Sequence, residues 1–196
     1  MSAREKIIAL VKEHYLEEFP EEEFIPGKSS IPVSGRTFDH KDIETLIDSS
    51  LDFWLTEGRY TDLFEKKFSE FLNVKKTVPV NSGSSANLLA FSSLTSPKLK
   101  DRAIKKGDEV ITVATGFPTT INPIIQNGCI PVYIDCELDT YNINVENLSD
   151  ALSEKTKAVM IAHTLGNPFD VDKISQFCKD NDLFLIEDSC DALGSK

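Results

Sequence analysis

Residues 183–194 read Leu-Phe-Leu-Ile-Glu-Asp-Ser-Cys-Asp-Ala-Leu-Gly. An apolar run that ends in two acids is typical of a buried parallel strand, and open α/β sheets place their ligands outside the carboxyl ends of such strands. We therefore predict that Asp188 lies at a ligand-binding edge of a sheet. The alternative is that Asp188 only caps the following turn.

Four further strands are predicted upstream, and helical patterns separate them. The five predicted strands cover residues 77–81, 109–114, 131–135, 158–162 and 183–187. The helices between them cover residues 83–94, 119–127, 145–152 and 171–179, and a long basic connection, a loop or short helix, fills residues 95–108. This alternation predicts a parallel sheet with helices on both faces, so the fold class is α/β.

The first part of the chain has a different pattern. Helices are predicted for residues 4–18 and 39–55, on either side of an irregular arm rich in proline and glycine. A third helix follows, with Phe64, Phe68, Phe71 and Leu72 as its expected buried face. We predict N-terminal helices and an arm in residues 1–58, and a sheet domain in residues 59–196.

Composition and net charge argue against several classes of function and partner. The 196 residues carry a net charge of −11, which argues against nucleic acid or an anionic membrane surface as the main partner. The N-terminus has no apolar segment of signal-peptide length, and no apolar run approaches the roughly 20 residues that span a bilayer. A cytoplasmic protein is expected. The cysteines lack Cys-x-x-Cys spacing and are expected to be reduced thiols; they are Cys129, Cys136, Cys178 and Cys190.

A serine-rich turn follows the first predicted strand. Gly83, Ser84 and Ser85 open a helix, whose N-terminus offers free N–H groups and the positive end of the helix dipole. These groups suit a phosphate. The alternative is an ordinary serine cap. The turn has neither the Walker lysine nor the Gly-x-Gly-x-x-Gly pattern, which argues against a Rossmann dehydrogenase.

Two more side chains follow predicted strands. Phe117 comes after the second strand, where an aromatic ring can stack on a flat cofactor or belong to the core under the next helix. His163 comes after the fourth strand, where it is either a structural hydrogen-bonding residue or part of the site. A phosphate site, an aromatic ring and an acid at one sheet edge suit pyridoxal phosphate, whose ring nitrogen pairs with an acid.

At these stretches the chain resembles a known family. The stretches are Leu-Thr-Glu-Gly-Arg-Tyr (55–60), Ser-Gly-Ser-Ser-Ala-Asn-Leu-Leu (82–89), Gly-Phe-Pro-Thr-Thr (116–120), Ala-His-Thr-Leu-Gly-Asn-Pro (162–168) and Ile-Glu-Asp-Ser-Cys-Asp-Ala-Leu-Gly-Ser (186–195). The chain is similar to DegT/StrS-type sugar aminotransferases, which have the type I fold of pyridoxal-phosphate enzymes. Within this family it resembles the CDP-4-keto-6-deoxy-D-glucose-3-dehydratase branch. The resemblance implies a three-layer α/β/α large domain, incomplete here.

The resemblance also implies roles for the residues. Gly83, Ser84 and Ser85 bind the cofactor phosphate, Phe117 stacks on the ring, and Asp188 pairs with the ring nitrogen.

The remaining implied residues separate the branches of the family. His163 and Asp191 complete the expected cofactor site, and Asp191 stands where most aminotransferases of the family have glutamine, which favours the dehydratase branch. Cys190 matches one ligand of that branch's [2Fe-2S] cluster, while the other three cysteines of the chain match none. The reactive histidine or lysine of the family lies beyond Lys196, so the catalytic residue is unknown.

The implied reaction follows from these assignments. Pyridoxamine phosphate would condense with the C4 ketone of a CDP-sugar, a histidine would remove a proton, and the C3 hydroxyl would leave. A reductase partner would supply electrons, in the synthesis of 3,6-dideoxysugars for lipopolysaccharide O-antigen. A homodimer is expected. The alternatives are a sugar aminotransferase and a non-catalytic α/β fragment.

The strand order of the type I fold adds a further expectation. Its last two strands would lie beside residues 77–81 and come after Lys196, so we expect this chain to be an N-terminal fragment that folds poorly or binds cofactor weakly by itself.

Overall fold

The computed structural model describes residues 1–21 and 23–195. It contains two compact units, Met1–Val78 and Pro79–Lys196. The predicted division into residues 1–58 and 59–196 stays a prediction. Among the described residues, no helix combines the length and the apolar character needed to cross a bilayer.

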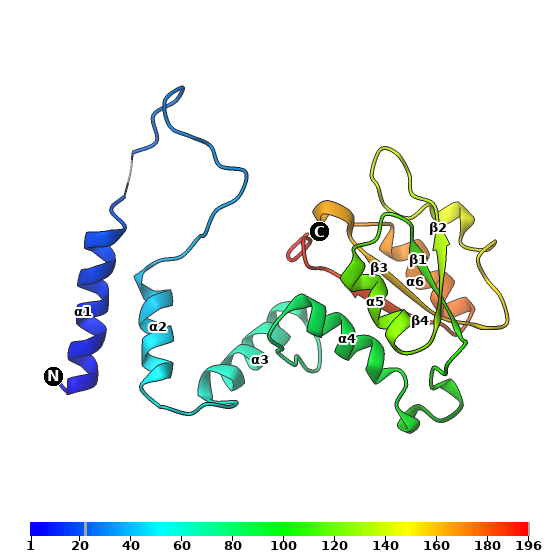
Figure 1. Cartoon of the computed structure of the whole chain (residues 1–196), viewed down its shortest axis with the longest axis horizontal. Coiled ribbons are helices and arrows are strands. Elements are labelled where there is room, and N and C mark those ends of the chain that lie inside the picture. Colours follow the sequence, from blue (N-terminus) through cyan, green and yellow to red (C-terminus); the bar gives the residue numbers. More distant parts are fainter. Residues whose placement is uncertain (22, 196) are drawn as a thin grey trace. The chain divides into compact units, whose positions relative to one another are not determined.

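The first unit consists of three helices, α1 (Ala3–Glu18), α2 (His40–Ser50) and α3 (Arg59–Leu72) (Figure 1). Asp39 caps α2 through the amides of Lys41 and Asp42, as an aspartate N-cap does. The predicted helix over residues 39–55 is too long. Phe53 has a φ of 46°, a left-handed backbone conformation that an α-helix does not continue.

Charged side chains join these helices. Arg4 of α1 donates to Asp48 of α2 over 2.6 Å, and Arg59 at the start of α3 pairs with both Asp48 and Asp52. Tyr60 donates a further hydrogen bond of 2.7 Å to Asp48. The hydrogen bonds from Arg59, Tyr60 and Arg4 hold the pKa of the Asp48 carboxyl well below its usual range.

The expected burial of one face of α3 is wrong. None of the described residues of α3 is buried, and Phe64 and Phe71 are largely exposed. Their rings contact Phe68 instead, with centroids 5.1 Å and 6.1 Å away. Helical spacing brings such rings together, but a second apolar layer is needed to bury them, and the described part of this unit contains none.

The second unit is built on a parallel sheet, which confirms the predicted α/β class. Its strands are β1 (Glu109–Val113), β2 (Ile130–Ile134), β3 (Thr156–Ala162) and β4 (Phe184–Asp188). Their order is β2-β1-β3-β4, and every pair is parallel (Figure 1). All four strands therefore present their carboxyl ends at one edge.

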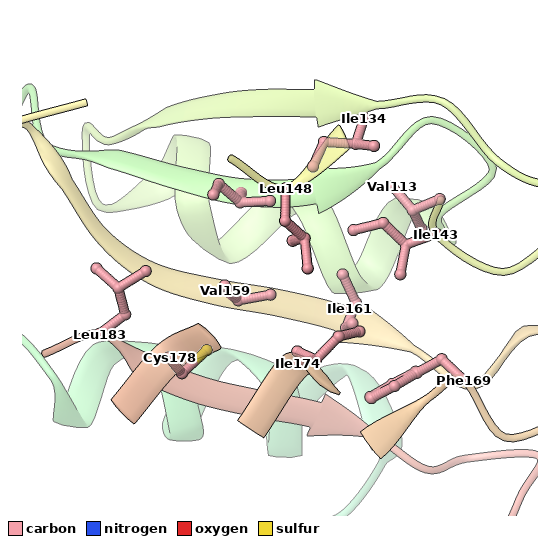
Figure 2. Packing of buried hydrophobic residues seen from close by; sticks show 11 residues of the cluster. Val113, Ile134, Ile143, Leu148, Val159, Ile161, Phe169, Ile174, Cys178 and Leu183 are labelled. Atoms are coloured by element: carbon pink, nitrogen blue, oxygen red, sulfur yellow. The ribbon is translucent and has the colours of Figure 1, made fainter. Parts of the chain in front are cut away.

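Helices cover both faces of this sheet. On one face, α4 (Gly83–Ser93) and α5 (Pro118–Gln126) contribute Phe91 and Ile124 to a buried cluster with Val110 of β1. On the other, α6 (Val171–Asp180) packs against β3, where Figure 2 shows Ile174 close to Ile161. Alternate residues of β3 thus enter opposite cores, as expected for a strand buried on both sides.

Two predicted elements differ from the structure. Residues 77–81 form no strand, because a strand needs a hydrogen-bonded neighbour and no described segment pairs with them. Residues 145–152 form only the short 3-10 helix Val145–Asn147 followed by turns, since so short a helix has too few hydrogen bonds to persist without strong packing. The connection over residues 95–108 contains the 3-10 helix Pro97–Arg102, as predicted.

Candidate functional site at the carboxyl edge of the sheet

A cavity of about 230 Å³ lies at the carboxyl edge of the sheet, beside the start of α4. Seven of the eight predicted site residues line it: Gly83, Ser84, Phe117, His163, Asp188, Cys190 and Asp191. Segments more than one hundred residues apart in the chain therefore meet here, because parallel strands end at the same edge. The structure brings the predicted residues together.

Ser85 is the exception. It lines a shallow pocket on another side of α4, together with Ser84 and Leu88. The helix cap is made by Ser82, whose hydroxyl accepts from the Ser85 amide over 3.2 Å, and whose carbonyl accepts from the Ala86 amide. The first amides of a helix have no intrahelical acceptor, so those of Gly83 and Ser84 are the ones placed at the cavity for an anion.

Asp188 ends β4, and its carboxylate accepts three hydrogen bonds. Thr120 Oγ1 donates to Asp188 Oδ2 over 2.6 Å, and Asn87 Nδ2 donates to the same oxygen over 2.8 Å. The Cys190 amide donates to Oδ1 over 3.2 Å. The bond from Cys190 is the turn cap that we considered as the alternative role of Asp188. Asp188 therefore caps the turn and also lines the cavity.

Sequence reasoning missed Asn87 and Thr120. Thr120 is fully buried and Asn87 is 8% exposed. The one signal for Asn87 is that it precedes Phe91 by four residues, which places a polar side chain on the buried face of α4. Thr120 stands one helical turn after Phe117, but nothing local distinguishes it from any other threonine at the start of a helix.

Phe117 is the N-cap residue of α5, and its side chain is 68% exposed. This exposure excludes the alternative that Phe117 is a core residue under that helix. An exposed ring in the wall of a cavity offers a flat apolar surface against which a planar ligand can stack.

His163 is buried and has structural partners. Its ring stacks on Phe169 with centroids 4.1 Å apart and planes 6° apart, and its Nε2 lies 3.2 Å from Glu187 Oε2. The Nδ1 atom has no hydrogen-bond partner among the residues that the structure describes. The structural role that we considered for this histidine therefore accounts for most of its contacts, although the ring also lines the cavity.

A buried asparagine supports the loop after β3. Asn142 Oδ1 accepts from the Thr164 amide over 3.1 Å, and Asn142 Nδ2 donates to the Asn167 carbonyl over 3.0 Å. Gly166 of this loop packs against the backbone of Asp191. Asn142 therefore stabilises the loop that packs against the Cys190–Asp191 turn, a role that the sequence did not suggest.

The cysteines form no metal site within the described residues, where no group of three or more potential ligands is present. Cys190 is exposed, whereas Cys129 and Cys178 are buried. Burial raises the pKa of the Cys178 thiol to about 11, as for an inert core thiol. A [2Fe-2S] cluster thus has one candidate ligand, Cys190, among the residues described, and its other ligands would have to come from elsewhere in the complete protein.

The sequence is similar to that of a known protein family and of several characterised relatives. The family model of the DegT/DnrJ/EryC1/StrS aminotransferases matches residues 37–196. The lipopolysaccharide biosynthesis protein RfbH of Salmonella typhimurium is 51% identical over 98% of this chain and 44% of its own length. The dTDP-4-dehydro-2,6-dideoxy-D-glucose 3-dehydratase of Saccharopolyspora spinosa is 47% identical, over 98% of this chain and 42% of its own length.

A solved structure gives the same result. The E. coli GDP-4-keto-6-deoxy-D-mannose-3-dehydratase with bound hydrated PLP superimposes with a TM-score of 0.77 at 35% identity, over 85% of this chain and 42% of that one. The chain thus spans less than half the length of these relatives. By its sequence and by the architecture of its sheet, the chain belongs to the DegT/DnrJ/EryC1/StrS aminotransferase family.

Proposed function

We propose that the complete protein binds pyridoxamine or pyridoxal 5′-phosphate at this cavity and dehydrates a nucleotide-linked 4-keto-6-deoxyhexose at C3. The observation that carries the proposal is that the Asp188 carboxylate, the exposed Phe117 ring and the start of α4 line one cavity. Its volume of about 230 Å³ is below the roughly 300–1,000 Å³ of most small-molecule sites, so we expect other parts of the complete protein to extend the cavity.

Each side chain has a role that its chemistry supports. The amides of Gly83 and Ser84 and the Ser84 hydroxyl bind the phosphate, because a helix N-terminus attracts anions. Phe117 covers one face of the ring, and Asp188 holds the proton on the ring nitrogen. When bound, a pyridoxal cofactor supplies an electron sink for the substrate carbons. His163 and Asp191, which also line the cavity, orient the cofactor, and Ser85 supports the helix end.

The finer assignments come from the family resemblance. They are a CDP-sugar substrate, an electron-donating reductase, a [2Fe-2S] cluster with Cys190 as one ligand, a homodimer, a cytoplasmic location and a role in O-antigen synthesis. Asp191, at a position where most aminotransferases of the family carry glutamine, supports the dehydratase assignment. The names of two relatives, a lipopolysaccharide biosynthesis protein and a sugar 3-dehydratase, agree with it.

The second candidate function is transamination of a nucleotide sugar, which the name of the family favours. The two functions differ in the reactive residue, a histidine for dehydration and a lysine for transamination. A protein with the lysine would transfer an amino group from an amino acid to the sugar and would not release the C3 hydroxyl.

Cofactor binding and product formation test the proposal. Equilibrium dialysis of the full-length protein should show saturable binding of pyridoxamine phosphate, and Asp188→Asn should weaken it by about tenfold or more, because a charge-assisted hydrogen bond is lost. Mass spectrometry of the product from a CDP-linked 4-keto-6-deoxyhexose should show loss of the C3 oxygen in the presence of a reductant. Binding of no pyridoxal cofactor would contradict the proposal, and an amino sugar would support the second candidate.

A further inference from the structure

The two oxygens of Asp188 are not equivalent. Oδ2 accepts from Thr120 Oγ1 over 2.6 Å and from Asn87 Nδ2 over 2.8 Å. A carboxylate oxygen has about two lone-pair sites, so these two donors fill Oδ2. Oδ1 accepts, within the described part of the chain, only the 3.2 Å bond from the Cys190 amide. One acceptor site therefore stays open on Oδ1.

Asn87 and Thr120 can only donate to the Asp188 carboxylate and cannot accept from it. Asn87 Nδ2 also donates to the Thr119 carbonyl over 3.3 Å, so both protons of the amide are engaged with acceptors. A flipped amide would place its oxygen against a carboxylate and a carbonyl, which repel it. Thr120 has a single hydroxyl proton, and it faces the carboxylate. Both side chains thus direct their protons to the same oxygen.

The two donors also come from different helices. Asn87 belongs to α4, Thr120 belongs to α5, and Asp188 ends β4, so the carboxylate plane is fixed from two directions. Both donors are nine-tenths or more buried, where water competes little for these hydrogen bonds. An aspartate without such partners would rotate about its terminal torsion, which is broad and weakly restrained.

We propose that Asn87 and Thr120 are positioning residues for Asp188. They occupy Oδ2, so that the one open acceptor site of the carboxylate lies on Oδ1 and binds the protonated ring nitrogen of the cofactor. This inference rests on the proposed function, and it adds the residues that determine which oxygen binds and in which orientation. It concerns one atom of the ligand, so it predicts an effect that disappears when that atom is removed.

The test compares two ligands in the full-length protein. Pyridoxamine phosphate carries the ring nitrogen, and its 1-deaza analogue has a C–H group in its place; neither forms a Schiff base with a lysine. The wild-type protein should bind the former at least about tenfold more tightly. Thr120→Val and Asn87→Leu should each reduce this preference by about fivefold or more, while affinity for the deaza analogue stays within about twofold of wild type.

Two controls isolate the hydrogen bond. Thr120→Ser keeps the hydroxyl and should keep the preference. Thr112→Val makes the same change at a fully buried threonine whose hydroxyl has no partner among the described residues, and it should also keep the preference. In ¹⁵N NMR of the labelled cofactor, the ring-nitrogen shift of Thr120→Val and Asn87→Leu should move toward that of Asp188→Asn. If one of these variants does not fold, the other carries the same expectation from a different helix.

The outcomes separate the two proposals. Variants that keep the wild-type preference, or that weaken both ligands equally, would overturn the positioning role and leave cofactor binding intact. A wild-type protein that binds neither ligand would overturn the proposed function and this inference with it.

Discussion

Gly166 and Asp191 touch so closely that no side chain fits between them. A Cβ atom at Gly166 would lie 2.6 Å from the carbonyl oxygen of Asp191, and the φ of Gly166 is +80°. The loop after β3 thus supports the turn after β4, and that turn carries two residues of the cavity wall, Cys190 and Asp191. The shape of the candidate site therefore depends on a glycine outside it.

Gly166→Ala should destabilise the full-length protein by about 2–4 kcal/mol, because it combines backbone strain with a displaced turn. Urea unfolding measures the loss. Gly194→Ala is the matched control: Gly194 has a φ of +86° but open space at its Cβ position, so only the strain of about 1 kcal/mol is expected. Equal losses in the two variants would show that the contact with Asp191 contributes nothing.

Neighbouring serines at the start of α4 should differ in their effect on cofactor binding. Ser84 lines the cavity, so Ser84→Ala should weaken pyridoxamine phosphate binding by about fivefold to tenfold through loss of one hydrogen bond to an anion. Ser85→Ala should change it by less than about twofold, because Ser85 lies in another pocket. Equilibrium dialysis at fixed salt measures both constants, and the reverse order would show that the bound phosphate lies on the Ser85 side of the helix.

Two buried threonines should respond in opposite ways to replacement by valine. Thr120→Val should lower the free energy of unfolding by about 1–3 kcal/mol, since it removes a hydrogen bond to a carboxylate. Thr112→Val should leave it unchanged or raise it by up to about 1 kcal/mol, because the Thr112 hydroxyl has no partner among the residues described. Chemical denaturation of both variants in parallel measures the contrast. A large loss for Thr112→Val would show that its hydroxyl has a partner, such as a buried water.

Acid should loosen the first unit through Asp48. Because its pKa is depressed in the folded state, the stability that it contributes is present above its unfolded pKa of about 3.9 and is lost as the pH falls below that value toward the folded pKa. Fluorescence of Trp54, the only tryptophan, can follow the transition between about pH 5 and pH 2. Asp48→Asn should flatten this pH dependence.

Salt and a distant carboxylate provide the controls for that experiment. The arginine side chains of these ion pairs are exposed to solvent, so added salt should weaken the effect of Asp48. Glu13→Gln, at an exposed position on α1, should leave the acid transition unchanged. An Asp48→Asn variant with the same acid transition as wild type would assign that transition to other groups.

The fold class and most of the site followed from local pattern. Apolar runs that alternate with helical patterns predicted all four strands of the sheet and the helices beside them. Such predictions work because the spacing of apolar residues along a short segment reflects both its secondary structure and its buried face. The same runs placed Phe117, His163 and Asp188 at or just after strand ends. Because all strand pairs are parallel, these ends lie at the same edge of the sheet. The turn at Gly83 and Ser84 was recognisable for the same reason.

Sequence by itself determined which residues reach the carboxyl edge of the sheet, whereas only the tertiary structure decided what they touch there. Asn87 and Thr120 contact Asp188 across 101 and 68 residues of chain, and no periodicity encodes such pairs. Ser85 lines another pocket and not the cavity, because Ser82 caps α4 and so determines where the helix begins. Residues 77–81 have the composition of a strand but form none, because strand formation requires a hydrogen-bonding neighbour, and that neighbour is not a property of the segment itself.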